Sequence, residues 1–223
     1  PDPGAAIRHQ LGAPVPPRDP RQTLTRRPDV TETNERCPWC GTDPLYVHYH
    51  DTVWGRPEYD DQALFEKLCL DGQQAGLSWI TILRKQESYR AAFAGFDPEQ
   101  IVRFTGQDQA RLLENPGIIR NRLKVQSIIR NARSYLALKE QGIGFADFLW
   151  QFVEHQPRQN HWQTIDQVPV STAESEAMAR ALKKAGFNFV GPTIVYAFMQ
   201  ATGMVNDHLV TCPAHRECLE LAR

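Results

Sequence analysis

The sequence has no apolar run long enough to span a bilayer and no segment with the pattern of a secretory signal peptide. It has only five cysteines in 223 residues. An odd number of cysteines in a chain of this size argues against a disulfide framework and indicates a reducing compartment. We therefore expect no membrane association and a cytoplasmic location.

The sequence also has almost no net charge, with a formal value of −1 at pH 7. The protein as a whole therefore produces no strong field that would attract a polyanion. If the chain binds nucleic acid, the positive charge that does so must be gathered in one place.

Segments that alternate between apolar and polar residues are scarce, whereas helical spacing recurs along the chain. Two clear apolar stripes are Leu64, Phe65, Leu68 and Cys69, and Val125, Ile128, Ile129, Ala132 and Leu136. Expected helix starts and stops are Asp61, Ser78, Asp97 before Pro98, a capping box from Ser171 to Glu174, Gly186, Pro192 and Gly203. The prediction is an all-α fold.

The composition changes along the chain in a way that divides it into three parts. Residues 1–35 are rich in proline and arginine and lack apolar periodicity, so they are predicted to be a disordered arm. Residues 36–215 are predicted to form one helical domain with ample core, and residues 216–223 a C-terminal tail.

Two pairs of potential metal ligands lie almost a full domain apart. Cys37 and His50 stand near the start of the helical region, and His208 and Cys212 near its end. Together they offer two thiolates and two imidazoles, a set that suits tetrahedral zinc. His208 and Cys212 are four residues apart and would share one face of a helix. Taken alone, four residues divided in this way are also compatible with chance.

Two further stretches suggest contact with phosphate. The turn from Gly186 to Thr193 places two glycines, Gly186 and Gly191, before a helix N-terminus, where free N–H groups favour an anion. The stretch 117–139 contains six basic residues, among them Arg120 and Lys124, and no acidic residue. The alternatives are an ordinary tight connection between helices and a solvated helix face.

A third stretch suggests a pocket. Residues 71–79 place the carboxylate of Asp71 close to the indole of Trp79, and Tyr46, Tyr49 and Trp54 lie upstream. Aromatic faces with one carboxylate suit a flat cationic or electron-poor ring. Aromatic residues are more often part of the core, but a carboxylate between two apolar helices must be solvated, capping or functional.

Taken together, these strings resemble the 3-methyladenine DNA glycosylase I family. The resemblance rests on residues 43–51, Trp54-Gly55, residues 73–83, Phe96-Asp97-Pro98, residues 117–122, Phe189-Val190-Gly191 and residues 205–208, and it extends from about Cys37 to Cys212. It implies a helix-hairpin-helix glycosylase domain with a structural zinc, held by Cys37, His50, His208 and Cys212, that joins the termini.

The resemblance also implies roles for individual residues. Tyr46, Tyr49, Trp54 and Trp79 resemble the walls of a base pocket, and Leu77 would fill the gap that a flipped base leaves in the DNA stack. The turn at Gly191 and Thr193 resembles a hairpin that grips phosphate, with Arg120 and Lys124 adding positive charge.

The chain departs from the pattern of the family, for one at Val53, where the family often has an acidic residue before Trp54-Gly55. Asp71 stands where the family has a glutamate, so its contact with the base would pass through a water. Cys40 forms a Cys-x-x-Cys pair with Cys37 and competes as a zinc ligand. Asp207 is the other carboxylate near the hairpin, and we rank it below Asp71.

The expected activity is hydrolysis of the N-glycosidic bond of 3-methyladenine in double-stranded alkylated DNA, by a monomer in the bacterial cytoplasm and nucleoid. No lysine follows the Gly191 turn, where bifunctional relatives carry a Schiff-base lysine, so no strand cleavage is expected. Two alternatives remain: a DNA-binding module without activity, and a glycosylase for a different alkylated base.

Overall fold

The computed structural model describes residues 35–222, so the arm predicted for residues 1–35 lies almost entirely outside the described residues. The helices are α1 (Pro44–Thr52), α2 (Asp61–Gln74), α3 (Trp79–Leu83), α4 (Gln86–Ala92), α5 (Pro98–Ile101), α6 (Gly106–Glu114), α7 (Arg122–Glu140), α8 (Phe145–Trp150), α9 (Ala173–Lys184), α10 (Pro192–Ala201) and α11 (Pro213–Leu221). Short 3₁₀ turns cover Pro38–Cys40, Ala94–Phe96, Gln151–Val153 and Ile165–Gln167. The prediction of a helical fold is confirmed.

The described part contains one small departure from an all-α fold. Strands β1 (Arg158–Gln159) and β2 (Val205–Asn206) form a parallel pair with only two residues each. No described helix has the length and apolar character needed to cross a membrane.

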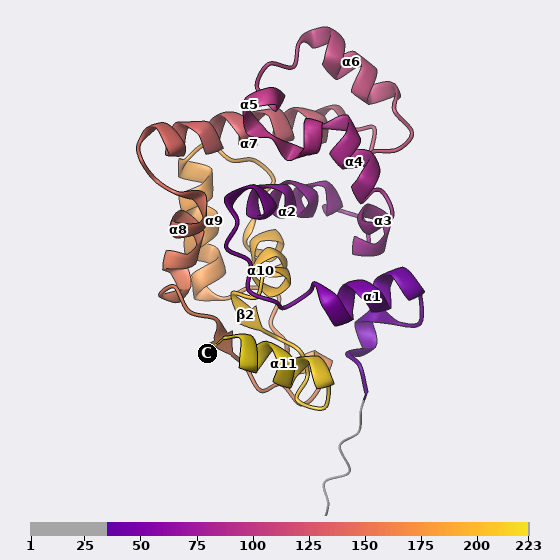
Figure 1. Ribbon diagram of the computed structural model, residues 1–223, viewed down its shortest axis with the longest axis vertical. Coiled ribbons are helices and arrows are strands. Elements are labelled where there is room, and N and C mark those ends of the chain that lie inside the picture. Colours follow the sequence, from indigo (N-terminus) through magenta and orange to yellow (C-terminus); the bar gives the residue numbers. More distant parts are fainter. Residues whose placement is uncertain (1–34, 223) are drawn as a thin grey trace, which may run out of the picture. The chain divides into compact units, whose positions relative to one another are not determined.

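Helix α2 is the centre of the core and packs against α10, α7, α8 and α3 (Figure 1). Its apolar stripe is buried as predicted, but its N-cap is Asp60, whose carboxylate accepts from Ala63 N at 2.8 Å. Asp61 instead accepts the backbone N–H groups of Phe145 and Ala146 at 3.1 and 2.8 Å, and so caps α8. A side chain predicted to start its own helix therefore starts another, because the two helix ends meet in space.

Helices α9 and α10 form a hairpin. The capping residue of α9 is Thr172, one position later than predicted, since its side chain accepts from Ser175 N while Ser175 Oγ accepts from Thr172 N. Helix α9 ends as expected at Gly186, which has a φ of +98°. At that end Phe187 N donates to Leu182 O, which satisfies a carbonyl of the last turn.

The loop of this hairpin is anchored on α7. Asn131 of α7 accepts from Asn188 N at 2.8 Å and donates to Asn188 O at 3.3 Å. Phe189 of the loop lies close to α2, because a Cβ added to Gly72 would be 3.1 Å from the Cβ of Phe189. The hairpin is therefore held against the residue that follows Asp71.

Helices α1 and α11, from opposite ends of the described chain, lie near each other (Figure 1). Arg56, in the loop after α1, forms an ion pair with Glu217 of α11 at 2.6 Å. Helix α11 runs to Leu221 and buries Cys218, so most of the segment predicted as a tail from residue 216 is helix. Its apolar side packs against the loops around the predicted metal ligands, which is why it belongs to the fold.

Candidate active site and metal centre

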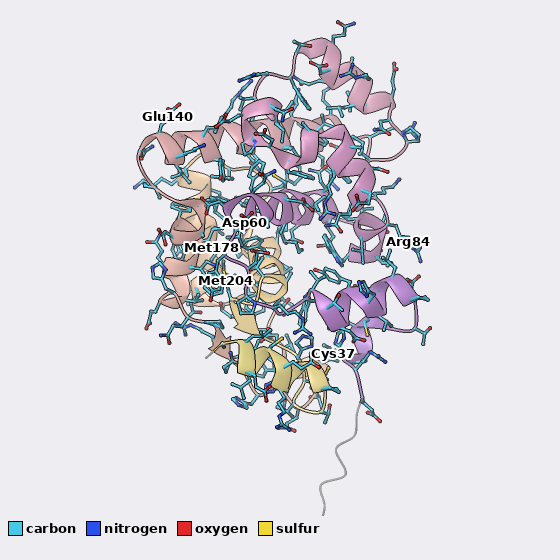
Figure 2. The ribbon with its side chains drawn as sticks, in the orientation of Figure 1. Cys37, Asp60, Arg84, Glu140, Met178 and Met204 are labelled. Carbon is cyan, nitrogen blue, oxygen red and sulfur yellow. The ribbon has the colours of Figure 1, made fainter. Side chains whose placement is uncertain are left out.

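The four predicted metal ligands meet in one buried cluster. The ligand atoms of Cys37, His50, His208 and Cys212 all lie within 4.8 Å of one another. Cys37 Sγ is 3.6 Å from His208 Nδ1, and Cys212 Sγ is 3.6 Å from His50 Nε2. In Figure 2, Cys37 lies between α1 and α11. The fold therefore joins the two pairs into a site that could hold a metal ion.

Each imidazole of the cluster is oriented by a second contact. His50 Nδ1 is 2.7 Å from the carboxylate of Asp51, and His208 Nε2 is 3.1 Å from the carbonyl oxygen of Trp54. Each ring therefore turns its other nitrogen toward the thiols. This is the usual arrangement of metal-binding histidines, in which an outer oxygen fixes the tautomer and the ring orientation.

The cluster forms differently from the way its spacing suggested. His208 and Cys212 were expected on one helix face, but residues 208–212 form a turn closed by Cys212 N and Leu209 O at 2.8 Å. Cys40 is not part of the cluster, because its thiol donates to Cys37 O at 3.2 Å. Cys40 is buried in its own contact and does not compete for the site in this structure.

The contacts within the cluster shift the pKa values of its thiols and imidazoles in different directions. The hydrogen bond with Cys37 lowers the pKa of Cys212, and hydrogen bonds with His208 and His50 lower it further. Burial acts to lower the pKa of His50, but hydrogen bonds to Cys212 and Asp51 raise it overall. Of these shifts, only that of Cys212 favours the form that binds a metal, since the same hydrogen bond raises the pKa of Cys37 and a metal-binding His50 would have to be neutral.

A cavity of about 230 Å³ lies beside this cluster. It is lined by all four aromatic residues predicted for the pocket: Tyr46, Tyr49, Trp54 and Trp79. Trp39, which was not predicted, lines it as well. Trp39 is 5.1 Å from Tyr46 and 4.9 Å from Trp54 between ring centroids. The rings are tilted or edge-on to one another, so their contacts hold the wall in shape and leave a space suited to a flat ring.

The metal cluster and the cavity share a wall. Trp54 packs edge-on against His208 with ring centroids 4.7 Å apart, and Trp39 packs against His50 at 5.2 Å. Ligand imidazoles and cavity indoles are therefore in direct contact. The contacts that fix the imidazoles of His50 and His208 therefore also position the indoles of Trp39 and Trp54 in the cavity wall.

Asp71 lines the cavity and is only 2% exposed. Its Oδ1 accepts a hydrogen bond from the ammonium of Lys67, one turn earlier on α2, and its Oδ2 has no partner among the described residues. Burial raises the pKa of Asp71, and the charge and hydrogen bond of Lys67 act in the opposite direction. The carboxylate therefore has one oxygen that is held and one that remains available to a ligand.

Asp207 also lines the cavity but has no free acceptor position of this kind. Asn160 and Trp162 donate to its Oδ1 at 2.7 and 2.8 Å, and Tyr196 and Gln200 donate to its Oδ2 at 2.5 and 2.9 Å. These four donors link α10 to the segment beside β1, which gives Asp207 a structural task. This difference supports the rank of Asp71 above Asp207.

Leu77 lies on a tight turn at the end of α2 and is 39% exposed. Leu77 N donates to Gln74 O at 2.7 Å, with Ala75 extended and Gly76 at a φ of +78°. This is a type II turn, which requires a positive φ at its third position and therefore favours glycine there. The turn presents Leu77 beside Gln74, which lines the cavity.

Lys124 differs most from its expected role. It is 8% exposed, and its ammonium donates to Gln73 O at 2.8 Å and to Ala75 O at 2.7 Å. It therefore caps the C-terminus of α2, where unpaired carbonyls favour a cation. Burial lowers its pKa. The sequence predicted a phosphate contact, but the structure uses this charge to hold the turn that carries Leu77.

The remaining predicted contacts with DNA are exposed. Arg120 and Thr193 lie at the surface, just before the N-cap of α7 and in the first turn of α10. Among the ion pairs formed by the described residues, none involves Arg120. A Cβ added to Gly191 would meet nothing within 4 Å, so packing within the chain does not require glycine there.

Sequence reasoning missed three polar or aromatic residues at or beside the cavity: Trp39, Lys67 and Gln200. Lys67 could have been found from its position four residues before Asp71, which is ion-pair spacing on a helix. Trp39 and Gln200 carry no comparable signal, because only the folded chain brings them to the cavity.

Comparison with known proteins places the chain in a family. A sequence model of the methyladenine glycosylase family matches residues 39–216. DNA-3-methyladenine glycosylase 1 of Escherichia coli strain K12 is 54% identical over 178 residues, which cover 80% of this chain and 95% of the relative. A crystal structure of 3-methyladenine DNA glycosylase I is 55% identical, with a TM-score of 0.80, and covers 81% of this chain and 100% of its own.

A tyrosine-to-phenylalanine variant of 3-methyladenine DNA glycosylase I, solved in complex with 3-methyladenine, is 38% identical with a TM-score of 0.78. The match covers 80% of this chain and 96% of the other. The sequence match, the shared fold and the aromatic cavity agree with one another. The chain belongs to the methyladenine glycosylase family.

Proposed function

We propose that this protein is a DNA glycosylase that releases 3-methyladenine from alkylated DNA and leaves an abasic site. The observation that carries the proposal is the aromatic cavity with one unpartnered carboxylate oxygen, on Asp71, in its wall. Relatives that are more than half identical bear this activity in their names, and a similar fold has been solved with 3-methyladenine.

The chemistry follows from the charge of the substrate. Methylation at N3 makes the adenine cationic and weakens its bond to C1′ of deoxyribose. When that bond breaks, its electron pair goes to the base, which leaves as a neutral molecule. Water adds its hydroxyl to C1′ and releases a proton to the solvent, so little acid catalysis is needed.

The enzyme must flip the nucleotide out of the duplex and hold the base in the cavity. Stacking on Trp79, against which Tyr49 packs at a centroid distance of 5.6 Å, favours a cationic base over neutral adenine through the ring quadrupole. Asp71 acts as the acceptor that reads the edge of the base and favours its positive charge. Because aspartate is one methylene shorter than glutamate, this contact runs through a water.

The α9–α10 hairpin is the element that we assign to phosphate binding, as a helix-hairpin-helix motif on double-stranded DNA. Gly191 leaves room for close approach of a phosphate to the first N–H groups of α10, and Thr193 adds a hydroxyl in that turn. Arg120 contributes an exposed cation, and Leu77 fills the gap left by the flipped nucleotide. Such binding depends on salt and little on sequence.

We infer that the reaction ends at the abasic site, without strand cleavage. Cleavage by a bifunctional enzyme needs an amine that attacks C1′ and forms a Schiff base. Among the described residues that line the cavity, none is a lysine, and α10 contains none. Borohydride should therefore trap no covalent complex with damaged DNA.

We also propose that the metal is zinc. Zn–S bonds of about 2.3 Å and Zn–N bonds of about 2.0–2.1 Å in a tetrahedron place sulfur and nitrogen about 3.6 Å apart. Both closest sulfur–nitrogen pairs have this separation. With four protein ligands the ion has no open position, so it joins the chain ends and takes no part in the reaction. We expect a monomer in the cytoplasm that acts on the nucleoid.

The test is incubation of purified protein with methylated double-stranded DNA, followed by chromatography of the released bases. Release of 3-methyladenine supports the proposal. Release of another adduct instead would assign a different substrate base, and DNA binding without release would reduce the protein to a binding module.

A further inference from the structure

Lys67 is a half-buried cation beside the aromatic cavity. Its ammonium bonds Asp71 and lies 3.8 Å from the centroid of the Trp79 ring. The side chain is 15% exposed and lines a neighbouring cavity with Glu66 and Arg90, and Lys67 is not among the described residues that line the aromatic cavity. It therefore touches both groups that would bind the base without reaching the base itself.

The two oxygens of Asp71 are in different situations. Oδ1 is held by Lys67, whereas Oδ2 is buried and has no hydrogen-bond partner in the described part of the chain. A buried, unpaired carboxylate oxygen is costly unless a ligand or water satisfies it. An ion pair on one oxygen also fixes the rotation of the carboxylate, so that the other oxygen keeps a constant direction.

We propose that Lys67 is a positioning residue of the base pocket: its ammonium holds Asp71 by Oδ1 and reserves Oδ2 as the acceptor for the base. This inference rests on the proposed function, because it assigns to Lys67 the orientation of the group that reads the base. Because the side chain of aspartate is short, its carboxylate lies closer to the backbone and must be oriented toward the cavity to reach a ligand there. The ion pair with Lys67 fixes that orientation.

Lys67 also sets the ionisation of the pocket. Burial lowers the pKa of Lys67 and raises that of Asp71, and the attraction between the two opposes both shifts. The other titratable groups nearby are Tyr49 of α1, whose pKa burial raises, and Glu66 of α2, which pairs with Arg90 of α4 at 2.7 Å. None of these can replace the cation that Asp71 would lose with Lys67.

The ammonium further restricts how a base can stack. It occupies one face of the Trp79 indole, so a base can stack only on the opposite face. The indole also offers a free hydrogen-bond donor, because its Nε1 is buried without a partner among the described residues. Lys67 thus selects the face of Trp79 and the oxygen of Asp71 that meet the ligand.

The experiment compares Lys67→Met, which keeps the length of the side chain but removes the charge, with Lys67→Arg, which keeps the charge. Excision of 3-methyladenine is measured under single-turnover conditions from pH 6 to pH 9. In Lys67→Met the pKa of Asp71 should rise, because the charge and hydrogen bond of Lys67 that oppose the effect of burial are gone, so the ratio of excision at pH 9 to excision at pH 6 should be larger than in the parent protein. Lys67→Arg should keep the parent profile.

Lys139→Met is the matched control, since Lys139 pairs with exposed Glu99 far along α7 and touches no cavity residue. Its pH profile should match that of the parent. The double variant Lys67→Met with Asp71→Asn should lose the new pH dependence, because the group that titrates is gone.

A measurement without DNA separates this inference from the proposed function. The carboxyl carbon of Asp71 can be followed by ¹³C NMR in aspartate-labelled protein and assigned by its absence in Asp71→Asn. A higher titration midpoint in Lys67→Met supports the inference even if the parent protein excises no 3-methyladenine, a result that would overturn the proposed function alone. Equal midpoints and equal pH profiles in the parent and Lys67→Met would overturn the inference.

Discussion

Replacement of Lys124 by methionine tests whether its charge serves the fold or the DNA. Methionine keeps the stem of the side chain but removes the two hydrogen bonds to Gln73 O and Ala75 O. Both carbonyls lie at the C-terminal end of α2, where no other described side chain replaces the ammonium. The exchange therefore tests one cap and changes little else in packing.

The expected cost follows from the burial of the site. A hydrogen bond to a charged group contributes about 1.5–3 kcal/mol, and Lys124 is only 8% exposed, so solvent screening is weak. The carbonyl of Ala75 can recover part of its loss from water, because its bond with Lys124 is only partly buried. We expect a loss of about 2–4 kcal/mol, or roughly 5–15 °C in the melting temperature of a domain of this size.

The assay measures thermal unfolding and the salt dependence of DNA binding in the same variants. Arg120→Met is the matched control, because Arg120 is exposed and forms no described ion pair. It should leave stability within about 0.5 kcal/mol and reduce the slope of log affinity against log salt by about 0.9. Lys124→Met should do the reverse: lower the melting temperature and leave the slope unchanged.

Excision should also fall in Lys124→Met, since its ammonium holds the turn that presents Leu77. The reasoning would be refuted if Lys124→Met had the melting temperature of the parent protein and its slope of log affinity against log salt fell as in Arg120→Met. Lys124 would then be a phosphate contact, as the sequence alone suggested.

The other predictions concern the metal, the cavity and the hairpin. His208→Ala should lose the metal, seen by elemental analysis, and should lower the melting temperature more than it lowers excision per folded molecule; purified parent protein without zinc would contradict this. Trp79→Ala should lose most single-turnover excision of 3-methyladenine, because base–aromatic stacking is worth about 1–3 kcal/mol. Asp71→Asn should fold but lose its preference for the cationic base, whereas Asp71→Glu should remain active; equal rates for the parent and Asp71→Asn would remove the carboxylate from base recognition. Gly191→Val should weaken DNA binding in titrations without lowering the melting temperature, since the added side chain meets open space, and unchanged affinity would exclude close approach of a phosphate there.

The sequence by itself determined the features that depend on local pattern. Apolar spacing identified α2 and α7, and proline and glycine located the boundaries of α10 to within a residue or two. These signals are reliable because helix periodicity and backbone preferences act over a few residues. The residue types also pointed to the four metal ligands and the cavity aromatics, the resemblance of several long strings to a family assigned their roles, and the structure brings each set together.

Only the tertiary structure decided which partner each polar side chain takes. Asp61 caps α8 and not its own helix, Cys40 stays outside the metal cluster, and Lys124 caps α2. Lys67 was overlooked although it touches Asp71 and Trp79. Long or polar side chains can satisfy their hydrogen bonds and charges in many ways in an unfolded chain. In the folded chain, each side chain bonds the partner that the packing of distant elements brings within about 3 Å. Sequence spacing does not encode that distance.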